Sequence, residues 1–497
     1  MPRCLFRRPS IKEPEQPHHL PRDSGVTSAT VSIIEADYLV VGAGAMGMAF
    51  VDTLLTDTAD TQATVVLVDE GHQPGGHWLS TYPFVRLHQP SAYYGVNSRP
   101  FGDDVVDSGG WNEGFYELAS GSEVCAYYDQ VMRHHLEPTG RLTYLPMTRY
   151  LGDHRLRTLD GAEHTVDVRR RLVDATYLKT TVPSMRPPPY TSAPDVEVVT
   201  PNDLPGRATH YDHFTIVGAG KTGMDACLWL LRNGMPPERV RWIMPRDSWL
   251  MNRATVQPAP RFLDEVRAAI VGRMQASFEA TSVDDLFERL EANGSLMRID
   301  TAVQPTMYHC AIVSERELEQ LRRIGDVVRL GHVERIEPER LILRDGTMPA
   351  DPGSLYVDCT ASGLSRPPSV PVFSDEKITL QSVRGCQQVF SSALIARVEA
   401  NYDTDDERNA LCVPVPHPDA PADWLRITMS DNDAQARWLR DADLAAWLES
   451  ARLNILRGMF ADLPTDAETR ATAVDAIAGT LAACNEKLAG LSNDAGP

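Results

Sequence analysis

The stretch Tyr38-Leu-Val-Val-Gly42-Ala-Gly44-Ala-Met-Gly47 decides the fold. An apolar strand runs into a turn with three spaced glycines, and the residues that follow, 46–55, have the pattern of a helix. In a dinucleotide-binding βαβ unit the first glycine allows the tight turn, the second lets a phosphate approach the backbone, and the third lets helix and strand pack closely. The free N–H groups and positive dipole end of the helix then face a pyrophosphate. Gly42, Gly44 and Gly47 are therefore predicted to hold a dinucleotide.

A second apolar run, Val65–Val68, follows the helix and ends on Asp69 and Glu70. This point is about 20 residues beyond the glycines, where a carboxylate can accept hydrogen bonds from ribose hydroxyls. This register favours a ribose-binding role for Asp69, and the alternative is that Asp69 is an exposed acid at a strand end. Glu70 is the competing carboxylate for the same role. The turn Gly75-Gly76-His-Trp78 comes next. Gly76 lets the backbone come close to a cofactor, and Trp78 is either a ring beside that cofactor or a core aromatic.

The same pattern recurs later in the chain. A strand at 213–217 leads into Gly218-Ala-Gly220-Lys221-Thr222-Gly223, then a helix to residue 232 and a second strand at 240–244. No acid stands directly at the end of that strand; Arg246 stands there instead. An arginine at this place can pair bidentately with a ribose 2′-phosphate, which favours NADPH over NADH. Lys221 either adds positive charge to this site or is an ordinary surface lysine.

Two dinucleotide units imply two dinucleotides, and the simplest chemistry they support is hydride transfer from a nicotinamide to a flavin. We assign FAD to the first unit, because it lies at the N-terminal end of the fold and the turn at 75–78 lets backbone approach the cofactor. NADPH is assigned to the second unit. The predicted fold is α/β, with two nested Rossmann-like domains and a helical C-terminal segment.

The 497 residues suffice for two or three domains. We expect a flexible, proline-containing leader over 1–34, an FAD-binding domain formed by 35–205 and 350–460, an NADPH-binding domain over 206–349 with a helical insertion, and a helical tail over 461–497. Within the first domain a helix is expected over Cys125–His134 and a strand over Thr165–Tyr177.

The net charge of −20 argues against nucleic acid or an anionic membrane as a partner. No apolar run reaches the roughly 18 residues that a membrane helix needs. The eight cysteines are scattered, without a CxxC pair or zinc spacing, and Cys227 and Cys359 fall in apolar patterns typical of buried thiols. This usage fits a reducing cytoplasm and argues against a disulfide-type flavin reductase. No metal site is expected.

At this point the motifs resemble those of the flavin-containing monooxygenase family, which includes Baeyer–Villiger and N-hydroxylating relatives. The matching segments, in chain order, are the FAD fingerprint 42–47, the acid Asp69 with the GGxW turn 75–78, the flavin-lining segment Arg86-Leu-His-Gln-Pro-Ser91, a shortened FxGxxxH signature over Leu204–His210, the NADP turn Gly218–Asp225 and an ATG-type turn over Asp358–Gly363. The resemblance covers residues 35–365.

The resemblance implies that NADPH reduces FAD, that oxygen adds to the flavin C4a atom, and that the resulting hydroperoxide passes one oxygen atom to a small molecule. A thioether sulfur or an amine nitrogen is the favoured acceptor. The partners it implies are a small-molecule substrate and O2, in a cytoplasmic enzyme for which a homodimer is one expected assembly. Competing interpretations are Baeyer–Villiger oxygenation, or an NADPH-dependent flavin oxidoreductase or oxidase without oxygen transfer.

The segment after the first unit carries the candidate catalytic residues. By the family's register, its catalytic asparagine falls on Gln89, and the aspartate of the Baeyer–Villiger branch aligns with His88. Gln89 can hydrogen-bond the flavin edge, the nicotinamide or the peroxide, or can be a loop amide satisfied by backbone. His88 can make the same hydrogen bonds, can relay a proton, or can be a histidine that packs in the loop. Arg86 either contacts phosphate or lies on the surface.

Overall fold

The computed structural model describes residues 32–351, 353–361, 363 and 365–494. Its largest sheet has eight strands, in the order β19-β20-β6-β1-β2-β3, with β4 and β5 joined to β6. Their bounds are β1 Ser32–Val41, β2 Val65–Val68, β3 Leu142–Leu145, β4 Thr148–Gly152, β5 Arg155–Thr158, β6 Glu163–Asp174, β19 Phe373–Ser374 and β20 Lys377–Thr379. The pairs along β20-β6-β1-β2-β3 are parallel, so these strands end at one edge of the sheet.

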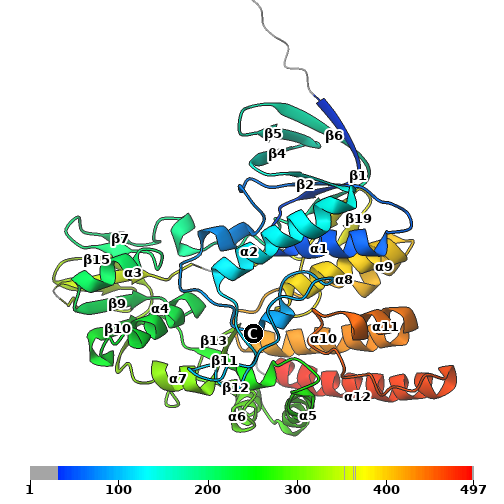
Figure 1. Ribbon diagram of the computed structural model, residues 1–497. Helices are drawn as coiled ribbons and strands as arrows, with labels where there is room; N and C mark the ends of the chain where they lie inside the picture. Colours follow the sequence, from blue (N-terminus) through cyan, green and yellow to red (C-terminus); the bar gives the residue numbers. More distant parts are fainter. Residues whose placement is uncertain (1–31, 352, 362, 364, 495–497) are drawn as a thin grey trace, which may run out of the picture.

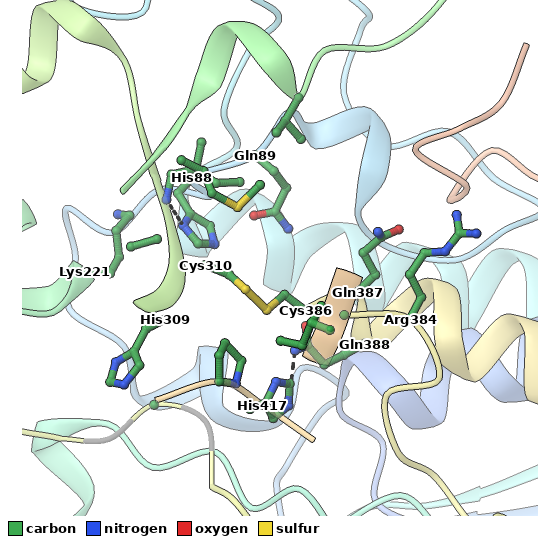
Figure 2. Close-up of a pocket in the computed structure, with 18 of the residues that line it drawn as sticks. His88, Gln89, Lys221, His309, Cys310, Arg384, Cys386, Gln387, Gln388 and His417 are labelled. Carbon is green, nitrogen blue, oxygen red and sulfur yellow. Dashed lines mark hydrogen bonds between the residues drawn. A yellow bond between two sulfur atoms is a disulfide. The ribbon is translucent and has the colours of Figure 1, made fainter. Parts of the chain in front are cut away.

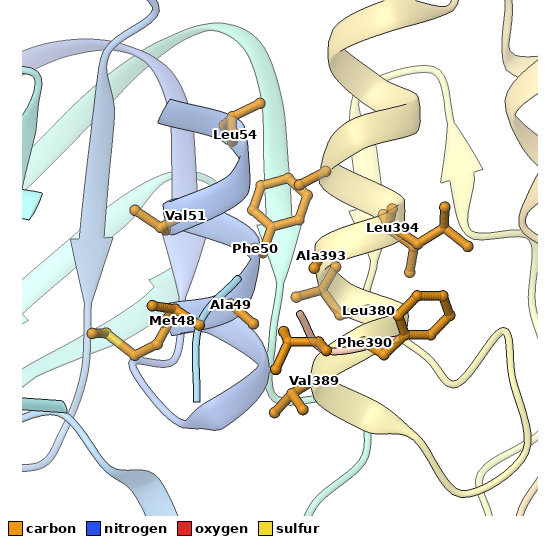
Figure 3. Packing of buried hydrophobic residues seen from close by; sticks show 14 of the residues in the cluster. Met48, Ala49, Phe50, Val51, Leu54, Leu380, Val389, Phe390, Ala393 and Leu394 are labelled. Carbon is orange, nitrogen blue, oxygen red and sulfur yellow. The ribbon is translucent and has the colours of Figure 1, made fainter. Parts of the chain in front are cut away.

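Two helices far apart in the sequence cover this sheet side by side. Helix α1, Ala45–Asp57, packs against α8, Gln388–Asn401 (Figure 3). Apolar side chains interdigitate between them, and these are fully or almost fully buried: Met48, Ala49, Phe50, Leu54, Val389, Phe390, Ala393 and Leu394. Burial of this apolar surface, at about 25 cal/mol per Å², stabilises the link between the two ends of the chain. The eight-stranded sheet and its helices thus combine segments from the first and last parts of the chain.

The second sheet has five parallel strands in the order β14-β10-β9-β18-β8. Their bounds are β8 Val198–Val199, β9 His213–Val217, β10 Val240–Ile243, β14 Asp326–Val328 and β18 Ser354–Asp358. Helix α4, Lys221–Arg232, follows β9, and α7, Glu315–Leu321, packs on α4. In Figure 1 this sheet lies to the left of the first one.

The remaining elements flank these two units. A three-stranded sheet consists of β11 Ser248–Asn252, β12 Leu296–Met297 and β13 Met307–Val313; a four-stranded one consists of β7 Thr191–Ser192, β15 Val333–Ile336, β16 Arg340–Leu343 and β17 Gly346–Pro349. The other helices are α2 Gly121–Val131, α3 Leu204–Arg207, α5 Leu263–Glu279, α6 Val283–Ala292, α9 Asp405–Leu411, α10 Ala422–Arg440, α11 Ala442–Ser450 and α12 Ala467–Asp494. Helix α12 packs along α10 and against α5 (Figure 1). Among the described residues no helix is both long and apolar enough to cross a bilayer.

The two predicted βαβ units are confirmed as β1-α1-β2 and β9-α4-β10, and with them the α/β class. The helix predicted over Cys125–His134 begins earlier, because Ser120 and Glu123 form a capping box at its N-terminus. It ends in a π-helical turn, Met132–Leu136. Residues 1–31 of the expected leader lie outside the described residues, whereas 32–34 already belong to β1.

Candidate functional site

A cavity of about 1510 Å³ lies where the parallel strands of both large sheets end. The carboxyl ends of β1 and β9 lead directly into the two glycine turns, and Gly42, Gly44, Gly218 and Gly220 all line this one cavity. In open α/β sheets, ligands bind outside the carboxyl ends of the strands. The geometry therefore joins the two predicted nucleotide sites in a single space.

The first turn leaves the start of α1 open. Gly44 is the N-cap, no side chain caps the helix, and its first turn carries no acid. By contrast α2, α7 and α9 begin with Ser or Thr capping boxes. The unpaired N–H groups of α1 and its positive dipole end therefore face the cavity, which suits a phosphate. Gly47 does not line the cavity; a Cβ there would lie 1.9 Å from the Gly42 carbonyl oxygen, so this glycine serves close packing.

The GGxW turn packs directly against the first glycine turn, and the Gly75 N–H donates to the Ala43 carbonyl at 3.0 Å. A Cβ on Gly76, whose φ is +58°, would lie 2.9 Å from the Cα of Gly44. The two backbones are therefore in close contact, and a side chain at residue 76 would push them apart. Trp78 lines the cavity next to it and donates from its indole Nε1 to the Tyr94 hydroxyl at 2.7 Å.

The two competing carboxylates have separate surroundings. Asp69 lines the cavity, and its two oxygens accept hydrogen bonds from the backbone N–H groups of Ala43 and Gly71, both at 2.6 Å. Glu70 is not among the lining residues; its side chain is 66% exposed and pairs with Arg149. Only Asp69 is therefore in a position to meet a ribose.

The second turn repeats the first one. Gly220 is the N-cap of α4 without a side-chain cap, and Lys221 and Thr222 line the cavity beside it. Gly223 lies outside the lining and packs against the strand, since a Cβ there would lie 2.1 Å from the Gly218 carbonyl oxygen. Lys221 pairs with Asp225 one turn along the helix, so part of its charge is neutralised inside the protein.

Asp225 also accepts a hydrogen bond from the Tyr82 hydroxyl at 2.7 Å. This bond ties α4 to the loop that follows the first unit. Burial raises the pKa of the Asp225 carboxyl, against the opposing effect of Lys221. Arg86, on the same loop, lines the cavity and donates to the Leu118 carbonyl at 2.8 Å.

Arg246 belongs to a basic cluster on the cavity wall. Arg246 Nη1 lies 3.0 Å from one Asp419 oxygen, and Arg366 Nη2 and His309 Nε2 each lie 2.9 Å from the other. All four residues line the cavity. Burial opposes ionisation of Asp419, but hydrogen bonds from His309 and Arg246 outweigh it and lower the pKa to about 2. The single negative charge of Asp419 thus holds Arg246 and Arg366 side by side, and the cluster keeps a net positive charge.

His88 and Gln89 point into the middle of the cavity (Figure 2). The Nδ1 atom of His88 accepts the backbone N–H of Ile312 at 3.1 Å, which leaves Nε2 to carry the proton. Burial, and then Lys221 and Arg253, lower the pKa of His88 to about 3, so the ring is neutral at neutral pH. The amide oxygen of Gln89 is buried and has no hydrogen-bond partner among the described residues.

A disulfide between Cys310 and Cys386 crosses the same region of the cavity (Figure 2). The scattered cysteines, with no CxxC pair, were interpreted as fitting a reducing cytoplasm and as arguing against a disulfide-type flavin reductase, and they gave no sign of this bond. A CxxC pair is one way to bring two sulfurs together, but here the fold brings residues 76 positions apart into contact. Cys227 and Cys359 are buried and free, as expected.

The sequence analysis missed the part of the site that comes from the second half of the chain. Cys310, Cys386, Gln387, His417 and the basic cluster around Asp419 lie on separate segments without a shared motif. One signal was present. The run Gln381-Ser-Val-Arg-Gly-Cys-Gln-Gln388 is polar, yet it lies between apolar segments, as a buried functional loop does.

No protein-family model matches the chain. Two mycobacterial proteins are similar over most of its length: uncharacterized protein Rv2000 of Mycobacterium tuberculosis (strain H37Rv) and uncharacterized protein Mb2023 of Mycobacterium bovis. Each is 55% identical over 465 residues, which is 94% of this chain and 86% of theirs. The chain belongs to the family of these mycobacterial proteins.

Solved structures resemble this chain more distantly. They include oxidised steroid monooxygenase bound to NADP, with 13% identity, a TM-score of 0.45, and coverage of 93% of this chain and 98% of that one. Cyclohexanone monooxygenase from Rhodococcus sp. Phi1 bound to NADP+ has 13% identity, a TM-score of 0.43 and coverage of 75% and 85%. With TM-scores below 0.5, the assignment of the fold rests on the chain's own two sheets and glycine turns.

Proposed function

We propose that this protein is an FAD-dependent, NADPH-consuming monooxygenase of a small molecule. The observation that carries the proposal is that two uncapped glycine turns, from two different parallel sheets, open on one cavity. A chain that bound a single dinucleotide would need only one of them. Two dinucleotides in one space are what hydride transfer between a nicotinamide and a flavin requires.

The residues around the first turn fit FAD. Gly42 and Gly44 with the start of α1 would hold the pyrophosphate and Asp69 the ribose, and Gly44 and Gly76 present backbone without side chains to the cavity. The start of α8 also reaches the cavity without a side-chain cap, and its N-cap Gln387 has an unpaired buried amide oxygen. When bound, FAD supplies a two-electron acceptor for NADPH and the activation of O2.

The residues around the second turn fit NADPH. Gly218, Gly220 and Thr222 would hold the pyrophosphate at the start of α4, and Arg246 the 2′-phosphate. Arg366 and His309, which share Asp419 with Arg246, would add donors to the same phosphate. This cluster is the reason to prefer NADPH over NADH.

His88 and Gln89 would serve the reaction as hydrogen-bonding groups. A neutral imidazole with its proton on Nε2 donates a hydrogen bond but gives up no proton near neutral pH. The Gln89 amide is free to bind cofactor or oxygen. Apolar residues on the same wall, Leu250, Ile312 and Leu453 among them, would keep water away from the reacting atoms. A thioether or an amine remains the favoured acceptor, with a ketone as the Baeyer–Villiger alternative.

One observation favours a second candidate, an NADPH-dependent flavin oxidoreductase without oxygen transfer. Gln89 stands where the family that the sequence resembles has its catalytic asparagine, and a disulfide lies close to it. The replacement removes the asparagine that the resembled family uses for oxygen transfer, and the disulfide is a reducible group in the cavity that could accept electrons in place of oxygen.

The test is to load the protein with FAD, reduce it with NADPH without oxygen, and then add 18O2 with a panel of thioethers, amines and ketones. We expect flavin bleaching by NADPH and one 18O atom in a product. The Gln89→Leu variant should still bleach but release more hydrogen peroxide. Gln275→Leu, the same change on an exposed glutamine of α5, should behave as the wild type. Recovery of all NADPH electrons as hydrogen peroxide, with every class of substrate, would exclude the monooxygenase.

A further inference from the structure

The disulfide joins two parts of the protein that hold different nucleotide turns. Cys310 lies in β13, in the segment between the second turn and β18, whereas Cys386 lies just before α8, which packs on α1. Their Cα atoms are 6.5 Å apart. Both cysteines line the cavity that both glycine turns also line. A purely structural disulfide has no need to lie in this cavity.

The backbone at both cysteines is unusual. Cys310 and Cys386 have φ values of +54° and +59°, in the left-handed region that side chains with a Cβ rarely adopt. In β13 this conformation accompanies a register shift against β11, between the pairs Trp249–Tyr308 and Met251–Ile312. Such a conformation is unfavourable for a residue with a Cβ, and it persists mainly where function requires the position of the side chain. Here it directs both sulfurs into the cavity.

Unpaired polar atoms surround the pair. The buried Gln89 Oε1, Gln387 Oε1 and His417 Nδ1 have no hydrogen-bond partner among the described residues, and Figure 2 shows these side chains around the disulfide. Buried polar atoms are normally paired, and these three line the cavity, so they are free to pair with a ligand bound there. The disulfide thus lies inside the binding space and not beneath it.

We propose that Cys310–Cys386 is a redox-active disulfide, reduced inside this cavity by the flavin at the expense of NADPH. The proposal rests on the proposed function, because it needs both dinucleotides in the cavity. It assigns an additional activity that the oxygenation of a substrate does not require: the storage of two electrons in a dithiol.

The step balances as follows. The S–S bond accepts a hydride equivalent, two electrons and one proton, from reduced flavin; the bond breaks, one sulfur becomes a thiol and the other a thiolate, and the flavin returns to its oxidised form. One NADPH, oxidised to NADP+, restores the reduced flavin. Cys386 is the better thiolate because it immediately precedes Gln387, the N-cap of α8, where the helix dipole stabilises negative charge. Cys310 then keeps the proton.

The first experiment follows the disulfide itself. The FAD-loaded protein is treated without oxygen with NADPH, with NADP+, or with nothing, then alkylated in denaturant and digested without reductant for mass spectrometry. We expect the cross-linked peptide pair containing Cys310 and Cys386 to disappear only with NADPH, and both cysteines to carry the alkyl label. Protein without FAD should keep the cross-link when NADPH is added, because in this proposal electrons pass from NADPH to the disulfide only by way of the flavin.

The second experiment counts electrons by anaerobic titration. Because a disulfide and a flavin each take two electrons, wild-type protein should consume about two NADPH per chain, and Cys386→Ser and Cys310→Ser about one. The control Cys412→Ala changes a buried cysteine that does not line the cavity, and it should again consume about two. The wild-type mass spectrum keeps the inference testable if a serine variant does not fold.

The outcomes separate the two proposals. If NADPH bleaches the flavin but the cross-linked peptide persists, or if both cysteines are already free in the isolated protein, the redox role is wrong and the proposed function stands. If NADPH does not bleach the flavin, or the protein cannot be loaded with FAD, both fail.

Discussion

Two of the three glycines of the second turn, Gly220 and Gly223, allow one prediction that separates binding from folding. Gly220 has ordinary φ, and a Cβ added to it would meet no atom within 4 Å, because the site faces the cavity. Gly223 is three residues further along, and a Cβ there would lie 2.1 Å from the Gly218 carbonyl oxygen. The same kind of change should therefore have opposite effects at the two positions.

We predict that Gly220→Ser leaves the fold intact or slightly more stable, by a few tenths of a kcal/mol, because serine is a preferred N-cap. Its hydroxyl would accept an N–H of the first turn of α4 and take that donor from the phosphate. Loss of about one charge-assisted hydrogen bond, roughly 1.5–3 kcal/mol, weakens NADPH binding by about 10- to 100-fold. Gly223→Ala should instead cost about 2 kcal/mol of stability and lower Tm by roughly 4–8 °C.

The assay is calorimetric titration of the FAD-loaded protein with NADPH, with Tm measured for each variant in the absence of nucleotide. FAD affinity serves as the internal control, since neither substitution touches the first turn. An unchanged Kd for NADPH in Gly220→Ser would refute the assignment of this turn to the nucleotide. A drop in Tm as large as that of Gly223→Ala would refute the claim that residue 220 faces open space.

Three further predictions concern charge. Arg246→Ala should lower the preference for NADPH over NADH, measured as the ratio of their Kd values, about tenfold or more. Arg246→Lys should give a ratio between those of the wild type and the alanine variant, because lysine keeps the charge but not the paired N–H donors of the guanidinium. An unchanged ratio would show that Arg246 does not contact the 2′-phosphate. Burial lowers the pKa values of His77, His88 and His417 to about 4, 3 and 4. Between pH 6.5 and pH 4 these rings are therefore neutral in the folded protein but protonated in the unfolded chain, where the pKa has its usual value of 6.5. Stability should therefore be fully present above pH 6.5 and fall as pH drops from 6.5 toward 4, and urea unfolding that gives the same free energy at both ends of that range would contradict this. Arg452→Ala should lower the free energy of unfolding in urea by about 2–4 kcal/mol and speed hydrogen exchange over residues 92–97, because carbonyls that accept hydrogen bonds from the guanidinium lose their partner. Unaltered exchange there would show that the loop is ordered without Arg452.

The sequence predicts the two βαβ units because their signals are local: an apolar run, glycines at fixed spacing, and a second apolar run. Asp69 and Arg246 follow the second strands of these units, so their place at the cavity was predictable for the same reason, whereas Gln89 was predicted only from the register of the family that the sequence resembles. Cofactor identity and the role of each residue remain proposals, since spacing alone does not specify chemistry.

The rest of the site depends on contacts between distant segments, which no local pattern encodes. Asp419 and Arg246 are 173 residues apart, and Cys310 and Cys386 are 76 apart. Asp69 and Glu70 both follow the end of β2, and the fold separates them. Asp69 accepts hydrogen bonds from the backbone of Ala43 and Gly71 and lines the cavity, whereas Glu70 pairs with Arg149 on the surface.

Arg452 has a consequence for how the protein is made. Its guanidinium lies among the carbonyls of Ala92, Tyr94 and Val96, so it fixes the loop that follows Gln89. A ribosome releases the chain from the N-terminus, and this arginine emerges long after both glycine turns. The wall of the cavity nearest Gln89 therefore forms only after the C-terminal helices have left the exit tunnel, and the apolar face of α1 stays open until α8 arrives to cover it. Stalled or C-terminally truncated chains would carry both glycine turns but would lack a finished cavity.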